Sequence, residues 1–209
     1  MSDRATTTTA MNGATPVVLL VAGPTSRALA QSVQVVFKAL DVAIDWQLLP
    51  VGQLAVDTVG EPLPESTING IRSAGRCLKT LLKTPVGSGY ASPNVGLRRA
   101  LKSRAGIRAL RTMKGVESRY GDLDLVLVRE LTEGVHAGIE HEITPGVVQT
   151  IKVTSRDKCV RLLTDAFELV RSAGRKHVTL VHKANIMKMS DGMLCAVGRE
   201  NAAKYTEIG

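Results

Sequence analysis

Apolar and polar residues follow two periods along the first half of the chain, one typical of buried strands and one of helices. Residues 16–22, PVVLLVA, are apolar throughout, which predicts a buried strand. Residues 29–40 carry apolar side chains at helical spacing, residues 44–49 indicate a second strand, and residues 64–74 indicate a short helix. Residues 77–82 indicate a third strand. Strands that alternate with helices favour an α/β fold with a largely parallel sheet.

The second half begins after a stretch rich in Gly, Ser and Pro, residues 83–94, which predicts a loop between two sub-domains. A basic helix is expected from Leu97, and the alternation over residues 123–128 predicts a central strand. Residues 136–153 hold a Pro-Gly pair between β-branched runs. We therefore expect two strands there, paired around a turn.

Two further helices are expected near the end of the sequence. Thr154 or Ser155 can cap the first of them, and its apolar stripe consists of Cys159, Leu162, Leu163, Ala166, Phe167 and Val170. Residues 177–181 indicate a strand. Ser190 is expected to open the last helix, with Asp191 near the positive end of the helix dipole.

Composition indicates a folded protein. A chain of 209 residues with 44% hydrophobic residues can form one large domain or two small ones around a buried core. The longest apolar run, residues 17–22, is far shorter than the roughly 20 residues that cross a bilayer, so no membrane span is expected. Residues 1–15 are rich in Thr and small side chains and lack the apolar core of a secretory signal, which predicts a disordered tail. They share only their hydroxyl content with a transit peptide.

Charge narrows the class of partner. The net charge of +8 and the pI of about 9.7 suit an anion, such as nucleic acid, acidic lipid headgroups or a tricarboxylate. Aromatic residues make up only 3% of the chain, and Lys and Arg are spread along it, which argues against nucleic acid. Cys77, Cys159 and Cys195 lack the spacing of zinc sites or disulfide frameworks, so we expect free thiols.

Three segments carry a resemblance to a known family. They read RYGDLDLVLVRELTEGVHAGIEHE over residues 119–142, GVVQTIKVTSR over 146–156 and HKANIMKMSDGM over 182–193. They resemble the NAD-dependent isocitrate dehydrogenases, which belong to the β-decarboxylating dehydrogenase family. The resemblance implies an isocitrate/isopropylmalate dehydrogenase-like α/β fold. Residues 16–88 would form the N-terminal part of its large domain, and residues 89–209 a small domain with clasp-like strands near 136–153. The C-terminal half of the fold would be absent.

The resemblance implies five substrate-binding residues. The stretch SPNVGLR is similar to the substrate loop of the family, in which Ser92 and Asn94 would hydrogen-bond the substrate and Arg98 would bind a carboxylate. Arg108 and Arg129 match the second and third arginines, and the planar guanidinium suits a carboxylate because it donates two parallel hydrogen bonds. The Ser and Asn pair favours isocitrate over isopropylmalate. Taken alone, Arg98 is also compatible with an ordinary solvated charge.

Two residues match catalytic positions of the family. Lys183 matches its acid/base lysine, and a lysine beside developing negative charge can exchange a proton once burial lowers its pKa. An exposed cation at a strand end is the alternative for Lys183. His136 stands where the family has Tyr. Imidazole can shuttle a proton but is shorter than phenol, so His136 is a degraded catalytic position, a working substitute or a packing residue.

The cofactor and metal expectations also rest on the resemblance. Lys83, Thr84 and Asn185 would contact NAD. The Mg²⁺ or Mn²⁺ ion of the family would bind aspartates that follow the position of Gly209, so no metal ligand is assigned in this chain. Residues 22–30, AGPTSRALA, replace the acidic, Gly-rich turn GDGIGPE that relatives carry after the first strand.

Two functions from different classes remain open at this stage. The first is an isocitrate dehydrogenase (NAD)-like subunit, whose family reaction converts isocitrate to 2-oxoglutarate, although this chain is expected to be incomplete for catalysis by itself. The second is a catalytically silent structural or regulatory subunit. Either would bind isocitrate or a citrate-like anion and join other isocitrate dehydrogenase-type subunits, with no membrane partner. The family resemblance implies a mitochondrial location, with the cytoplasm as the alternative. RNA binding is a third, less favoured hypothesis.

Overall fold

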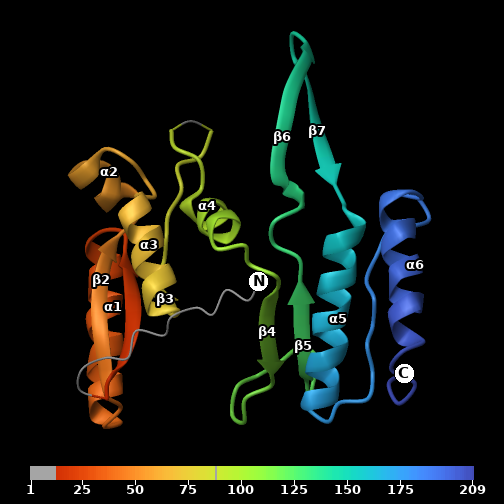
Figure 1. Cartoon of the computed structure of the whole chain (residues 1–209), viewed down its shortest axis with the longest axis horizontal. Helices are drawn as coiled ribbons and strands as arrows, with labels where there is room; N and C mark the ends of the chain where they lie inside the picture. Colours follow the sequence, from red (N-terminus) through yellow and green to blue (C-terminus); the bar gives the residue numbers. More distant parts are fainter. Residues whose placement is uncertain (1–12, 88) are drawn as a thin grey trace, which may run out of the picture. The chain divides into compact units, whose positions relative to one another are not determined.

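The computed structural model describes residues 13–87 and 89–209. Most of the tail expected over residues 1–15 lies outside the described residues. The chain divides into two compact units, one that ends at Lys102 and one that runs from Ser103 to Gly209. Helices alternate with strands in the first unit, whereas four strands precede two helices in the second, so the mixed α/β class is confirmed but only the first unit has the expected parallel sheet (Figure 1). The domain boundaries expected from the sequence stay a prediction.

A three-stranded parallel sheet forms the centre of the first unit. Its strand order is β2-β1-β3, with β1 at Thr15–Val21, β2 at Ile44–Pro50 and β3 at Cys77–Lys79. Helix α1, Pro24–Ala39, connects β1 to β2, and α3, Glu65–Ala74, precedes β3. Parallel neighbours need such crossovers, because a parallel strand cannot follow a tight turn.

Both faces of β1 are covered, which explains why residues 16–22 are apolar without interruption. Val18 and Leu20 pack with residues of α3 and α4, whereas Leu19 and Val21 pack with Ala30 of α1 on the opposite face. Successive side chains of a strand point to opposite faces, so a strand between two layers needs apolar residues at every position. The sequence predicted this strand within one residue at each end.

Two helices of the first unit follow the sheet connections. Helix α2 spans Gln53–Val59 and had not been anticipated, since seven residues are too few to establish a helical period. Helix α4 spans Pro93–Ala100, starts directly after Ser92 and buries Leu97. The basic helix expected from Leu97 is therefore present, but it begins four residues earlier.

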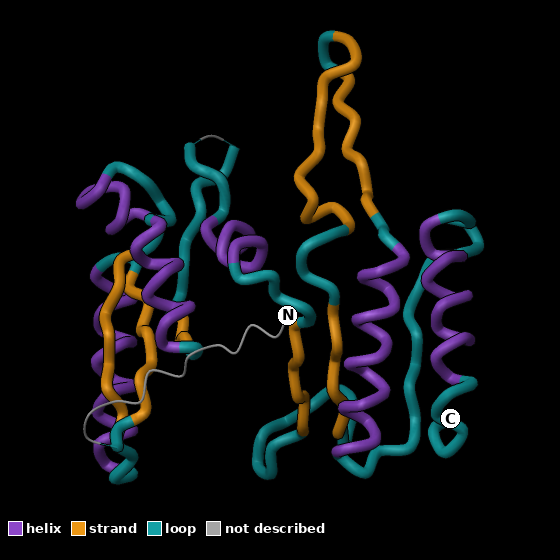
Figure 2. The backbone as a smooth tube through the Cα atoms, in the orientation of Figure 1, coloured by secondary structure: helices purple, strands orange, loops and turns teal. Residues whose placement is uncertain are grey.

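The strands of the second unit form two antiparallel pairs. Strand β4, Gly106–Arg111, pairs with β5, Asp124–Arg129. Strands β6, Gly134–Thr144, and β7, Val147–Val153, form a long hairpin that extends as an arm (Figure 2). The strand pair expected over residues 136–153 is confirmed, whereas β4 had not been recognised in the sequence.

Two helices complete the second unit. Helix α5, Arg156–Ser172, packs against α6, Ser190–Ala202. The residues buried on α5 are Cys159, Leu163, Ala166 and Phe167, all members of the expected stripe. At the far end of α5, Phe167 packs with Tyr205 and Ile208.

The strand predicted over residues 177–181 was wrong, because this segment forms no β-ladder. Its backbone instead exchanges two hydrogen bonds with Gly209: the Val178 amide donates to Gly209 O, and the Gly209 amide donates to Lys176 O, both at 2.8 Å. A β-branched run becomes a strand only where another strand offers a row of partners. The third predicted strand is also shorter, three residues instead of six.

Among the helices of residues 13–87 and 89–209, none combines the length and the apolar character that a bilayer crossing requires.

Candidate functional site

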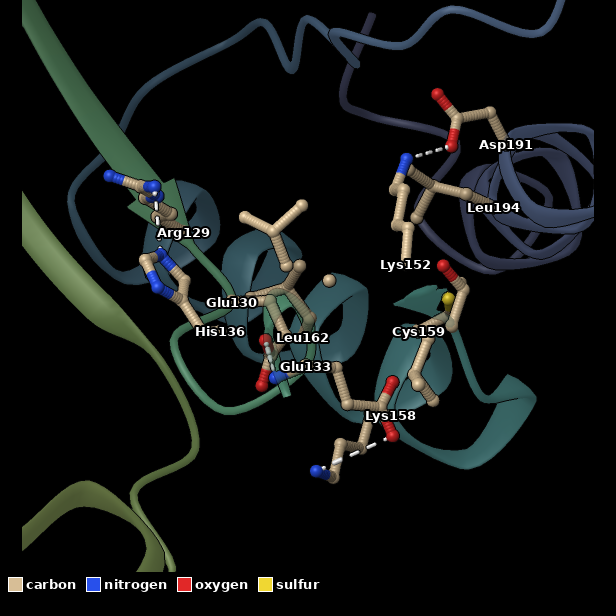
Figure 3. Close-up of a pocket in the computed structure, with 14 residues that line it drawn as sticks. Arg129, Glu130, Glu133, His136, Lys152, Lys158, Cys159, Leu162, Asp191 and Leu194 are labelled. Carbon is tan, nitrogen blue, oxygen red and sulfur yellow. Dashed lines mark hydrogen bonds and ion pairs between the residues drawn. The ribbon is translucent and has the colours of Figure 1, made fainter. Parts of the chain in front are cut away.

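The second unit contains a cavity of about 280 Å³ where β5, β6, β7, α5 and α6 meet (Figure 3). Arg129 and His136, two residues predicted from the sequence, line it. Lys152, Lys158 and Asp191 line it as well. The carboxylates of Glu130, Glu133 and Asp191 line it too, and Lys152 and Lys158 form ion pairs with Asp191 and Glu133. The Arg129 side of the cavity, next to apolar walls, therefore suits a small anion better than the lysine side does.

Arg129 and His136 are in direct contact at the edge of this cavity. Arg129 Nη2 lies 3.1 Å from His136 Nε2. A guanidinium nitrogen can only donate, so Nε2 accepts in this contact and the ring carries its proton on Nδ1. In this arrangement Nε2 is a base already engaged by an arginine, which differs from the free hydroxyl of a catalytic tyrosine.

Two glutamates fix the loop that joins Arg129 to His136. Glu130 accepts hydrogen bonds from the hydroxyl and amide of Thr132 and from the amide of Glu133. Burial raises the pKa of the Glu130 carboxyl, but these hydrogen bonds and the Lys158 charge outweigh it and lower that pKa overall. The loop is thus folded back on itself.

Glu133 attaches this loop to the start of α5. It accepts from the amide of Ser155 at 2.8 Å and from its hydroxyl at 2.7 Å, and its Oε1 lies 3.4 Å from Lys158 Nζ. Ser155 therefore occupies the cap position expected from the sequence, but its hydroxyl donates to Glu133 and does not cap a helix amide. The sequence analysis had assigned no role to Glu133.

Arg108 lies on the same face of the β4–β5 pair as Arg129. Gly106 is opposite Arg129, and Arg108 is opposite Leu127, two residues before Arg129. Residues at this diagonal spacing share a face, with Cα atoms roughly 7–8 Å apart. Arg108 does not line the cavity, but the β4–β5 register places two of the three predicted arginines on one sheet face.

Asp191 joins Lys152 to Lys183. Its Oδ1 accepts from Lys152 Nζ at 2.5 Å, and its Oδ2 accepts from the backbone amide of Lys183 at 2.7 Å. Asp191 is only 5% exposed. The hydrogen bond from Lys152, followed by the one from the Lys183 amide, holds the pKa of Asp191 below its ordinary value, so the carboxylate is charged at neutral pH. Sequence reasoning had missed Lys152 and had placed Asp191 only by the helix dipole.

Lys183 and Asn185 lie outside the cavity. Both are exposed, in a segment without strand or helix that precedes α6. The structure therefore brings the Lys183 backbone close to the cavity through Asp191, while the Lys183 and Asn185 side chains are not among its lining. Their catalytic and cofactor-binding roles stay predictions.

The first unit contains a second cavity, of about 480 Å³, beside the turn between β1 and α1. Lys83 and Thr84, both predicted cofactor contacts, line it together with Gln53 and Tyr90. The turn is held by Ser26, which accepts from the Ala22 amide at 2.8 Å and hydrogen-bonds Thr80. The first turn of α1 has no acidic residue.

These lining residues fit part of a dinucleotide. Lys83 and the positive end of α1 suit a phosphate, whereas Thr84 and Gln53 can hydrogen-bond a ribose or an amide. The volume lies in the usual range of ligand cavities. The turn over residues 22–30, AGPTSRALA, thus carries no acidic residue and is closed by hydroxyl contacts.

Ser92, Asn94 and Arg98 lie on or next to α4 in the first unit. The Thr84 hydroxyl donates to Ser92 Oγ at 3.3 Å, so a predicted cofactor residue contacts a predicted substrate residue. Asn94 Oδ1 is buried and has no hydrogen-bond partner among the residues that the structure describes. A buried acceptor without a donor is costly, and a substrate hydroxyl would satisfy it. Arg98 lies close enough to Lys79 to lower the pKa of that ammonium, after burial, which is the larger cause.

A metal ion does not fit the residues that the structure describes. Across residues 13–87 and 89–209, no group of three His, Cys, Asp or Glu side chains is placed to hold one. Asp124, the first residue of β5, instead forms ion pairs with Arg175 and Arg111.

Comparisons with known proteins agree with this geometry. The family described as isocitrate/isopropylmalate dehydrogenase matches residues 22–209. The chain is 39% identical over 180 residues to a probable mitochondrial isocitrate dehydrogenase [NAD] subunit alpha of Drosophila melanogaster, a match that covers 86% of this chain and 48% of that protein. It is 36% identical to a chloroplastic 3-isopropylmalate dehydrogenase of Solanum tuberosum, with 86% and 50% covered.

The fold has a solved counterpart. The crystal structure of isocitrate dehydrogenase from Methylococcus capsulatus superposes with a TM-score of 0.87 at 38% identity, covering 92% of this chain and 58% of that one. The chain spans about half the length of the curated relatives that it matches.

Proposed function

The chain belongs to the isocitrate/isopropylmalate dehydrogenase family, and on that premise we propose that it is an isocitrate dehydrogenase (NAD)-like subunit that binds isocitrate or a citrate-like anion. The family reaction would be the oxidative decarboxylation of isocitrate to 2-oxoglutarate with reduction of NAD. The chain would bind the anion but would be incomplete for catalysis by itself.

The observation that carries this proposal is the cationic edge of the cavity in the second unit. Arg129 lies beside His136 there, Arg108 shares its sheet face, and Lys152 lines the opposite side. A tricarboxylate needs several fixed cations, and arginine binds carboxylates through paired hydrogen bonds. Charge-assisted bonds of this kind contribute more than neutral ones.

Ser92 and Asn94 support isocitrate over isopropylmalate. The unpartnered Asn94 Oδ1 can accept from a hydroxyl, and Ser92 already faces Thr84. Both are polar, as the carboxylate-bearing side arm of isocitrate requires, whereas the isopropyl group of isopropylmalate would favour apolar neighbours. Arg98, on α4 of the first unit, is retained as a further proposed carboxylate contact.

NAD is the proposed cofactor, because the relatives named above include an NAD-dependent enzyme and because Lys83 and Thr84 line a cavity of suitable size. Asn185 is retained as a further proposed contact. When bound, NAD would supply the hydride acceptor. A divalent ion, Mg²⁺ or Mn²⁺, is implied by the family, but the described residues do not form a site for it.

His136 is the reason to propose incomplete catalysis. Its Nε2 accepts from Arg129, so this side chain is not in the state in which a phenol would donate a proton to an enolate. Lys183 is proposed as the matching acid/base residue. We also propose that the chain works with other isocitrate dehydrogenase-type subunits, and that it is mitochondrial, as the Drosophila relative is named.

Isocitrate titration tests the proposal. Calorimetry of the wild-type chain should give saturable binding of isocitrate and citrate, and Arg129→Met should weaken it by about tenfold or more, as expected for the loss of charge-assisted hydrogen bonds. Arg111→Met is the matched control, because Arg111 lies on the same strand pair, faces the other side and is 71% exposed. Equal losses for both variants, or no binding by the wild type, would refute the proposal.

A turnover assay distinguishes the two functions. Wild-type chain is mixed with a catalytically competent NAD-dependent isocitrate dehydrogenase subunit, isocitrate, NAD and Mg²⁺. A chain that works as an isocitrate dehydrogenase subunit should add isocitrate-dependent NADH formation, whereas a catalytically silent subunit should add none. His136→Tyr should raise the rate if only this side chain is missing. Turnover by the wild type at the rate of the tyrosine variant would instead make His136 a working substitute.

A further inference from the structure

We propose that Asp191 is a positioning residue, which fixes the backbone of Lys183 and couples it to strand β7 through Lys152. The inference rests on the proposed function, because it concerns the lysine to which that function assigns acid/base chemistry. It goes beyond it, because neither the family resemblance nor the comparisons assign a role to Asp191 or Lys152. Asp191 would act only through Lys183, whose backbone amide it accepts.

The hydrogen bonds of Asp191 divide between its two oxygens. Oδ2 accepts the Lys183 amide at 2.7 Å, whereas Oδ1 accepts Lys152 Nζ at 2.5 Å and the Ser190 hydroxyl at 3.4 Å. One carboxylate therefore joins the last part of β7, the first turn of α6 and the segment before α6. A buried carboxylate requires such partners, because an unpaired charge of this kind would be strongly destabilising.

The other backbone hydrogen bonds at Lys183 are local. Its backbone turns once, with the amides of Ile186 and Met187 both donating to Lys183 O at 3.0 and 2.9 Å. The Lys183 side chain is exposed. The position of Lys183 relative to β7 thus depends on the amide that Asp191 accepts. Lys152 also lies 3.5 Å from Met187 Sδ, which adds a second contact between the same two segments.

The Lys152–Asp191 ion pair lies in the wall of the proposed anion cavity. Lys152 and Asp191 both line it together with Arg129 and His136. Figure 3 shows the Lys152–Asp191 pair across the cavity from the Arg129–His136 pair. A ligand carboxylate bound between these two pairs would contact Lys152. Asp191 would then fix the position of Lys183 relative to that carboxylate.

Amide hydrogen exchange tests the position of Lys183 without any ligand. Asp191→Ala removes the acceptor, and we expect exchange of the Lys183 amide to rise about tenfold, the upper effect of one hydrogen bond. Asp191→Asn keeps an oxygen acceptor in the same place and should retain most of the protection. Lys152→Met cuts the link to β7 and leaves the buried carboxylate without its cation, so it should also raise exchange of this amide, but by less than Asp191→Ala because Oδ2 is still present to accept.

A matched control comes from a second ion pair. Arg156 Nη2 lies 2.5 Å from Glu200 Oε2 and joins α5 to α6 at an exposed position away from Lys183. Glu200→Gln should leave the Lys183 amide unchanged. Exchange in the rest of α6, around Val197 and Asn201, should stay protected in every variant.

Three outcomes would overturn the proposal: unchanged exchange at Lys183 in Asp191→Ala, an equal rise in Asp191→Asn, or a rise spread evenly over α6. The last outcome would reduce Asp191 to a purely structural residue. Because no isocitrate is present, failure of this test is distinct from failure of the proposed function, which depends on isocitrate titration.

Discussion

The central strand of the first unit and the strand pair of the second differ in how they are covered. Both faces of β1 are packed, and Val18, Leu19 and Leu20 are fully buried. The β4–β5 pair instead leaves Leu125 and Leu127 largely exposed on the face that also carries Arg108 and Arg129.

The two regions therefore depend on different interactions. In the first unit, apolar burial on two sides supplies the driving force, at about 25 cal/mol for each Å² removed from water. In the second unit, the cavity is shaped by carboxylates that bind backbone amides and lysines, namely Glu130, Glu133 and Asp191. Substitutions should therefore affect the two regions by different mechanisms and by different amounts.

The largest effect is expected in the first unit. Leu20→Ala removes a fully buried side chain of β1 and should lower the free energy of unfolding by about 2–5 kcal/mol. Trp46, the only tryptophan, lies on β2 and packs edge-on against Phe37. Its fluorescence during urea unfolding therefore reports this unit. Leu48→Ala, on the same sheet but 49% exposed, is the control, and an equal loss there would contradict the comparison.

A smaller effect is expected where Glu133 attaches the loop between β5 and β6 to the start of α5. Glu133→Ala removes the acceptor of the Ser155 amide and hydroxyl, and the half-buried donors left without it should cost about 1 kcal/mol locally. Hydrogen exchange over residues 129–136 and at the start of α5 measures this opening. Glu142→Ala provides the control, since Glu142 is exposed and accepts from the Gly146 amide in the turn of the hairpin. Protection that survives in Glu133→Ala would mean that this attachment is dispensable.

The next smaller effect is the pH dependence of the stability that ionised Asp191 contributes. The folded pKa of Asp191 is lowered from its ordinary 3.8, first by Lys152, so its ionised form stabilises the fold above pH 3.8. That contribution is lost as the pH falls from about 3.8 through the lower folded pKa. The stability difference between wild type and Asp191→Asn, measured by circular dichroism in urea, should be constant at neutral pH and shrink in acid. A difference that grows in acid would contradict this sign.

The smallest effect is expected on the exposed face. Leu127→Ala removes a side chain that is 46% exposed, and its cost should stay within about 0.5 kcal/mol, as for other surface substitutions. The same urea titration by circular dichroism measures it. A loss as large as that of Leu20→Ala would show that this face is covered in solution and would end the contrast between the two regions.

Much of the fold could be predicted because its signals are local. The unbroken apolar run over residues 16–22, the stripe of α5 and the Pro-Gly turn between β6 and β7 each indicated an element that the structure contains. Short or context-dependent segments were missed or misassigned. Helix α2 has seven residues, β4 interleaves arginines with small apolar side chains, and residues 177–181 lack a neighbouring strand.

The candidate site was predictable only in part. Family motifs pointed to Arg129 and His136, and the structure places them 3.1 Å apart. Lys152 lies within the quoted segment GVVQTIKVTSR, but no role was assigned to it, because a lysine in a strand is most simply a solvated charge. Glu133 and Asp191 were recognised as parts of motifs, but their partners could not be read from spacing.

The sequence alone determined the strands and helices that carry a clear period, such as β1 and α5, since side-chain periodicity is set by the geometry of each backbone type. It also determined the family, through the motifs around Arg129 and Lys183. Only the tertiary structure decided that Lys152 meets Asp191, 39 residues further along the chain, and that Asp191 holds the Lys183 amide. Such contacts depend on the path of the chain in space, and a buried carboxylate selects whichever donors that path brings within hydrogen-bond distance.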